Sequence, residues 1–358
     1  MGRAARVMAL FGRRSKSTPA QVRGAAAVTL PQVPVPEVTV DNLMGDQLAH
    51  RFAAELAAGR WQELHDFLAA TPDPEDRFFY VNQLSRVIAG DRPGWIDEWR
   101  AARPGSALPV LFSGAHHVRS AWEARGPTRG KYVTQDAAQL FHERLVRADR
   151  DLAAAAELDP RDPTPLAESM WVALGLSLGQ PELHRRFTEV NRRCPWHCGA
   201  YRAMSQGGGP KWGGSLGTLF GLARQVLDEA PDGHSVHTFV PTVHFERLLN
   251  FGREQDATAA DPDGYFQTPQ VRDQINQAAQ KSVGSPAYQP GHQAISDRNM
   301  FSMAFWLLGD HRAQLEQMHL TGPVISSVPW NYLNDPVGSY RKAWQEAAAA
   351  VAAGRTFR

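Results

Sequence analysis

Residues 207–215 read GGGPKWGGS and form the densest motif that could do chemistry. Glycine-rich backbone and a lysine ahead of a helix can bind a phosphate through N–H groups and positive charge. The order differs from the G-x-x-x-x-G-K-[ST] phosphate loop, and no buried strand precedes it. We therefore expect a structural loop in which Trp212 packs between helices and Ser215 caps the next helix.

Cys194 and Cys198 enclose a second candidate motif, CPWHC. Its spacing is C-x₃-C, whereas redox motifs use C-x₂-C. A zinc ion would need two further ligands, and His197 and His184 are the nearest in sequence. We interpret both cysteines as small buried residues at a turn made by Pro195. A metal site built from Cys194, Cys198 and His197 remains the weaker alternative.

Histidines offer a third possibility. His117 could join Trp122 and Arg125 in a cleft, and His237 and His244 would share a face if they stood on one helix. The H-E-x-x-H metalloprotease motif is absent from the sequence, as are the G-x-S-x-G elbow and the Rossmann and kinase fingerprints. We therefore expect no catalytic residues, no cofactor and no enzymatic activity.

Ten tryptophans provide the strongest hint of binding. Most should pack between helices, but tryptophan and arginine are also enriched where proteins bind partners. The residues predicted to line a concave binding face are Trp122, Arg125, His117, Lys211 and Trp212.

The elements that must position these residues are helices, because apolar residues recur three and four positions apart. Several of these patterns stop at a glycine, as at Gly59, Gly179 and Gly309. The predicted helices are residues 46–58, 61–70, 165–178, 181–194, 268–281, 297–308 and 312–319. Strand patterns are nearly absent, and the short apolar run 108–112 is flanked by helical patterns.

Prolines that end helices suggest a repeat. Pro160, Pro195 and Pro231 are 35 and 36 residues apart, close to the 34-residue tetratricopeptide period. The prediction is an all-α fold, an irregular tetratricopeptide-like array of helical hairpins over residues 41–358. Subdivision into 41–130 and 131–358 is possible, with a loop-rich segment at 254–292.

The sequence also resembles a family of uncharacterised bacterial proteins with tetratricopeptide-like helices. The resemblance covers residues 75–350 and is carried by WIDEW from Trp95, AWEARG from Ala121, LDP from Leu158, PKWGGS from Pro210 and residues 299–305. It implies a helical-repeat fold and protein binding, and it transfers no catalytic residue.

Charge is distributed unevenly along the chain. Residues 1–30 carry six basic residues and no acidic one, which leaves 32 basic against 37 acidic residues in the remainder. The folded body therefore has no bulk electrostatic reason to bind nucleic acid. We expect residues 1–40 to be a disordered basic tail followed by a proline-rich linker. As an alternative, residues 1–16 could contact an anionic membrane surface.

These observations favour a cytoplasmic, bacterial scaffold or adaptor protein. Arginine greatly outnumbers lysine, as in proteins from GC-rich bacterial genomes, and two cysteines are too few for a disulfide-stapled secreted domain. The partner would be a protein or peptide held in a helical groove. The alternative is an enzyme or metal-binding protein that uses a His/Cys cluster in a helical cleft.

Overall fold

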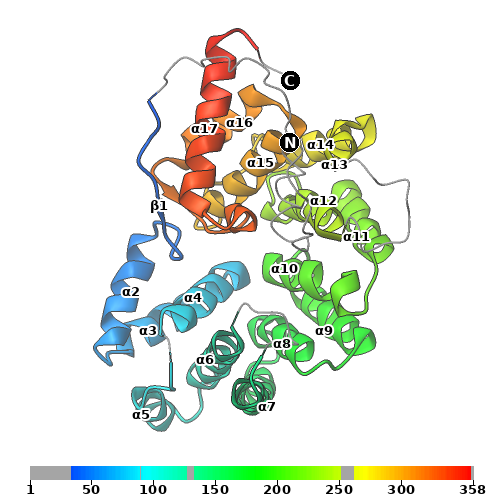
Figure 1. Ribbon diagram of the computed structural model, residues 1–358. Helices are drawn as coiled ribbons and strands as arrows, with labels where there is room; N and C mark the ends of the chain where they lie inside the picture. Colours follow the sequence, from blue (N-terminus) through cyan, green and yellow to red (C-terminus); the bar gives the residue numbers. More distant parts are fainter. Residues whose placement is uncertain (1–33, 89, 127–132, 251–261, 356–358) are drawn as a thin grey trace. The chain divides into compact units, whose positions relative to one another are not determined.

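A computed structural model describes residues 34–88, 90–126, 133–250 and 262–355, and it is all-α in these ranges (Figure 1). Sixteen α-helices and two strands of two residues each are present there. The chain divides into two compact units. The N-terminal unit is Gly45–Leu222, and the C-terminal unit is Ala223–Arg358 with residues up to Met44.

The N-terminal unit is built from consecutive helices. They are α2 (Gln47–Ala57), α3 (Gln62–Ala70), α4 (Pro74–Val87), α5 (Trp95–Ala102), α6 (Ala107–Arg125), α7 (Gln135–Leu158), α8 (Thr164–Gly175), α9 (Gln180–Arg193) and α10 (Cys198–Gly207). A 3₁₀ turn, η2 (Pro210–Trp212), follows, and α11 (Leu216–Glu229) begins in this unit.

The predicted hairpin near the start of this unit is confirmed. Asp46 accepts a hydrogen bond from the backbone N–H of Ala49 at 2.7 Å and begins α2. Phe52 and Leu56, both 1% exposed, form the buried face of this helix. Gly59 then adopts a φ of 77°, which a side chain would disfavour, and the chain turns into α3.

Aromatic stacking joins α3 to α5. The rings of Trp61 and Trp99 lie 5.6 Å apart with planes inclined by 13°. The Trp99 indole N–H also donates to Nδ1 of His65 at 3.1 Å. Trp99 is therefore fully buried with its one polar atom satisfied.

The long helices α6 and α7 pack closely at Gly114. A Cβ atom on this glycine would lie 2.7 Å from Cγ of Leu152 on α7, so a larger residue would push the helices apart. The apolar run 108–112, which is not a strand, is the first part of α6.

The C-terminal unit contains the remaining helices. They are α12 (Phe239–Asn250), α13 (Pro262–Gln267), α14 (Pro269–Lys281), α15 (Ala294–Leu308), α16 (His311–Thr321) and α17 (Pro336–Ala352), with 3₁₀ turns η3 (Ser235–Thr238) and η5 (Trp330–Leu333). The predicted helices 268–281, 297–308 and 312–319 correspond to α14, α15 and α16. Helix α13 was not predicted.

A short sheet in this unit also escaped prediction. Strand β1 (Thr39–Val40) pairs in parallel with β2 (Val324–Ile325). Two residues per strand are too few to show an alternating pattern in the sequence. Deeper in the unit, α15 is buried on nearly all sides, and its Asn299 accepts a hydrogen bond from the Trp330 indole at 2.8 Å.

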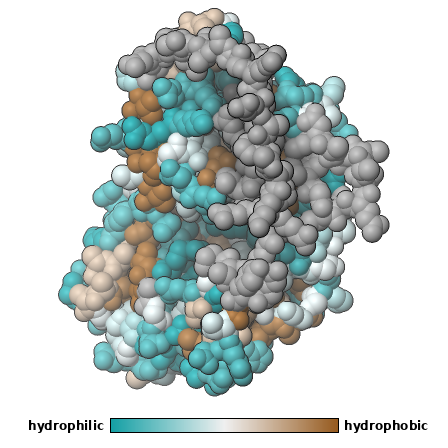
Figure 2. Space-filling view, in the orientation of Figure 1, coloured by the Kyte–Doolittle hydropathy of each residue, from teal (hydrophilic) through white to brown (hydrophobic). Residues whose placement is uncertain are grey.

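Residues 1–33, which include the predicted membrane-contact segment 1–16 and most of the predicted tail, lie outside the described residues. Within the described ranges, none of the helices combines the length and apolar character needed to cross a bilayer. Hydrophilic residues cover much of the coloured surface in the view of Figure 2, with hydrophobic residues between them.

Candidate functional site

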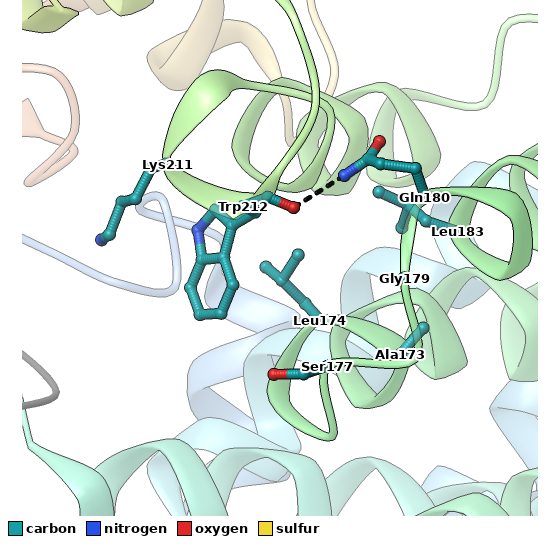
Figure 3. A pocket seen from close by; sticks show the side chains of 8 residues that line it. All are labelled: Ala173, Leu174, Ser177, Gly179, Gln180, Leu183, Lys211 and Trp212. Atoms are coloured by element: carbon teal, nitrogen blue, oxygen red, sulfur yellow. Dashed lines mark hydrogen bonds between the residues drawn. The ribbon is translucent and has the colours of Figure 1, made fainter. Parts of the chain in front are cut away.

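A small pocket in the N-terminal unit lies between α8, α9 and the glycine-rich loop (Figure 3). Its volume is about 270 Å³, slightly below the range of about 300–1,000 Å³ typical of small-molecule sites. The lining residues are Ala173, Leu174, Ser177, Gly179, Gln180, Leu183, Lys211 and Trp212. The pocket is mostly apolar and suits one side chain better than a large cofactor.

The glycine-rich loop is held in place by contacts to its backbone atoms. A Cβ atom on Gly214 would lie 1.9 Å from the carbonyl oxygen of Gly208, so only glycine fits there. Gln180 donates from Nε2 to the carbonyl oxygens of Gly207 at 2.7 Å and Trp212 at 2.9 Å. Both hydrogen bonds tie the loop to the start of α9.

The predicted helix cap at the end of this loop, Ser215, is confirmed. Ser215 Oγ accepts a hydrogen bond from the backbone N–H of Thr218 at 3.0 Å and caps α11. Gly213 adopts a φ of 81°, which lets the chain leave η2 and reach this cap.

Trp212 belongs to an aromatic cluster that continues from the pocket. Its ring packs edge-on against Trp122 of α6, with 6.1 Å between ring centres. Trp122 also contacts Trp171 of α8 at 6.4 Å and Phe141 of α7 at 5.1 Å. The three indoles are half-buried, so part of the cluster remains accessible to solvent.

Two basic side chains lie against this cluster. The guanidinium carbon of Arg125 is 5.6 Å from the centre of the Trp122 ring, and Nζ of Lys211 is 5.5 Å from that of Trp212. Both distances allow a cation–π interaction. The structure thus brings together four of the five predicted binding residues, namely Trp122, Arg125, Lys211 and Trp212.

The fifth predicted residue, His117, points elsewhere. It precedes Trp122 by five positions on α6, which separates the two by about 140° around the helix axis. Burial lowers the pKa of His117 to about 4, although the negative charge of Asp151 opposes the shift. His117 is 8% exposed and belongs to the interior on the opposite side of α6.

The cysteines do not form a redox or metal centre with His197 in the described structure. Cys194 and Cys198 are not joined in a disulfide and are half-buried, at the end of α9 and the start of α10. Burial, and then the charges of Glu75 and Asp73, raise the pKa of the Cys194 thiol to about 12. Over the described ranges, no three His, Cys, Asp or Glu side chains are grouped to hold a metal ion.

His197 is the N-cap residue of α10. Its Nδ1 accepts the backbone N–H of Ala200 at 3.2 Å and caps α10. Its side chain is fully buried, and this burial lowers its pKa to about 4. The ring therefore stays neutral at pH 7.

His237 and His244 stand on different elements, so they do not share one helix face. His237 lies in η3, with Nε2 3.1 Å from the carbonyl oxygen of Pro231. His244 lies in α12, with Nδ1 2.7 Å from the Tyr265 hydroxyl. Each ring is held by its own local partner.

Sequence reasoning missed the contributions of Phe141, Trp171 and Gln180 to the site. Nothing in the sequence distinguishes Trp171 from the other nine tryptophans. Gln180 donates to two backbone carbonyl oxygens, and no sequence pattern predicts such contacts.

No protein-family model, no curated protein and no solved structure matches the chain. Function must therefore be inferred from the chemistry of the site.

Proposed function

We propose that the N-terminal unit binds a peptide segment of a partner protein, with one apolar side chain inserted in the pocket beside Trp212. The supporting observation is the convergence of a pocket the size of one side chain with half-buried indoles and two basic residues. Such clusters of tryptophan and arginine contribute strongly to binding energy at protein interfaces.

The chemistry of the pocket specifies the ligand. Leu174, Leu183 and the Trp212 ring offer an apolar lining, and the Trp212 side chain extends beside Leu174 in Figure 3. Lys211 and Arg125 add positive charge at the edge of the ring cluster. A leucine-sized side chain next to an aspartate or glutamate complements both features.

The predicted repeat architecture is part of this proposal. The intervals between Pro160, Pro195 and Pro231 each contain two α-helices, α8 with α9 and then α10 with α11. This arrangement supports a tetratricopeptide-like pairing, and the resemblance to bacterial helical-repeat proteins points in the same direction. In such arrays, neighbouring hairpins bury each other's apolar faces and leave a groove for a partner. A scaffold or adaptor role follows from that mode of binding.

Selection of peptides from a random display library on the full-length protein tests the proposal. We expect the enriched peptides to share an apolar residue next to an acidic one. Their affinity for the Trp212→Ala variant should fall at least about tenfold, because a central indole anchor is lost. Trp196→Ala is the matched control, since Trp196 is a half-buried tryptophan that stacks on Tyr201 away from the pocket.

Retained folding of both variants should be checked by thermal unfolding. Peptides that bind Trp212→Ala as tightly as the unchanged protein would overturn the proposal, and so would a selection that enriches no common pattern.

A further inference from the structure

A second group of charged residues in the N-terminal unit lies where α4, α6, α8 and α10 meet. Its centre is Glu168 of α8, a carboxylate that is 0% exposed. Glu168 Oε1 accepts a hydrogen bond from Nδ2 of Asn82 at 2.8 Å. Its Oε2 accepts from Nη2 of Arg119 in a very short ion pair. Both carboxylate oxygens are therefore engaged, and one positive charge is neutralised.

Two more arginines lie close to this pair. Arg86 is one helical turn after Asn82 on α4, so both side chains share a face. Arg202 extends from α10. Neither guanidinium forms a hydrogen bond or an ion pair with any residue of the described structure, and both are accessible to solvent. The charge of Arg86 interacts with those of Arg119, Arg202 and Glu168, so three positive charges act near one carboxylate.

The pKa of Arg86 reflects these neighbouring positive charges. Partial burial, followed by the like charges of Arg119 and Arg202, lowers the pKa of Arg86 to about 10, and Glu168 only partly opposes the shift. The guanidinium stays charged at pH 7 but is held in an unfavourable field. An anion placed among the three arginines would relieve that repulsion.

Unused hydrogen-bond donors support the same conclusion. Arg119 Nε is buried and has no acceptor among the described residues. His197 lies within electrostatic range of Glu168 and Arg202, and burial keeps its ring neutral at pH 7. Its Nδ1 accepts a hydrogen bond from Ala200, so the ring proton is on Nε2. That buried Nε2 also has no partner there. Buried donors are rarely left unsatisfied, and an oxyanion bound to Arg119 would give its Nε an acceptor.

We propose that Arg86, Arg119 and Arg202 bind an oxyanion carrying two negative charges, of the phosphate or phosphomonoester class. Arginine suits this ligand because its planar fork of N–H groups matches phosphate oxygens and remains charged. The site is separate from the aromatic pocket and does not depend on peptide binding there.

Isothermal titration calorimetry of the full-length protein tests this site with inorganic phosphate and with glycerol 3-phosphate as probes. Sodium chloride at equal ionic strength and the dicarboxylate succinate are the comparison arms. We expect both phosphate probes to bind, and we expect succinate to bind at least about tenfold more weakly. A preference for one probe identifies free phosphate or its ester as the ligand.

Substitutions then locate the binding. Arg86→Gln and Arg202→Gln should each weaken phosphate binding at least about tenfold, because a charge-assisted contact is lost. Arg161→Gln, at an exposed arginine in the loop before α8, should leave it unchanged. Without ligand, Arg86→Gln should keep or raise the Tm, since it removes a like charge.

Three results would each overturn the proposal. They are no heat of binding beyond the chloride arm, equal affinity for succinate, and phosphate binding that persists in both Arg86→Gln and Arg202→Gln.

Discussion

Arg119 of α6 and Glu168 of α8 form an ion pair in which the arginine side chain is 11% exposed and the glutamate is not exposed at all. Two charges removed from water are tolerated only when each has close partners. Glu168 has a second partner in Asn82 of α4, so three helices of the N-terminal unit are joined through one carboxylate. The pair is therefore both a structural joint and the base of the proposed anion site.

Removal of the negative charge should weaken this joint severely. Glu168→Gln leaves the Arg119 guanidinium buried without a counter-charge, which typically costs about 3–5 kcal/mol in the free energy of unfolding. Urea denaturation measures the loss. The matched control is Glu55→Gln, which disrupts the ion pair with Arg60 at an exposed site and should barely change the Tm. Equal effects of the two substitutions would contradict the structural role.

Two glycines of the N-terminal unit should respond in opposite ways to alanine. Gly214→Ala places a methyl group against the Gly208 carbonyl oxygen and should destabilise the fold by about 1–3 kcal/mol. Gly221, in the middle of α11, has no atom within 4 Å of a new Cβ, so Gly221→Ala should stabilise by about 0.5–1 kcal/mol. Thermal unfolding of both variants provides the comparison. A stable Gly214→Ala protein would show that the loop contact is not obligatory.

His197 should make the free energy of unfolding depend on pH. Its pKa is about 4 in the folded protein against an ordinary value of 6.5, so the unfolded chain takes up a proton first. The stabilisation is complete above pH 6.5 and is lost as the pH falls toward 4. His197→Asn keeps a good helix cap and removes the titration. Between pH 7 and pH 5, the unchanged protein should lose about 2 kcal/mol more than this variant. Parallel stability curves would refute the assignment.

Cys194 should be an unreactive thiol. Its pKa of about 12 leaves far less reactive thiolate at pH 8 than an ordinary cysteine has. In the Cys198→Ser variant, where Cys194 is the remaining cysteine, maleimide labelling of the folded protein should be about a hundredfold slower than in urea. Labelling at the same rate in both conditions would be inconsistent with burial of the thiol.

Local chemistry made much of the helical pattern predictable. Gly59 and Gly309 were expected to stop helices, and each adopts a positive φ just after α2 and α15. Gly179 was expected to stop a helix too, but α8 already ends at Gly175, and Gly179 instead precedes α9. The cap at Ser215 and the packing of Trp212 were also predicted, because glycines, prolines and hydroxyl residues act on their immediate neighbours.

Long-range chemistry was not predictable in the same way. Asn82 and Glu168 meet across 86 residues, and Arg119 and Glu168 across 49. Such pairs depend on how helices pack, which no local pattern specifies. The prediction that His117 lies in one cleft with Trp122 was wrong for a local reason. Two residues five positions apart on an α-helix point in different directions, so the sequence alone could have excluded this pairing.

The stacked indoles of Trp61 and Trp99 have an optical consequence. Two identical chromophores 5.6 Å apart couple their electronic transitions, and coupled transitions add ultraviolet circular-dichroism bands that isolated indoles lack. The contact between α3 and α5 therefore carries its own spectroscopic label, which disappears when these two helices separate.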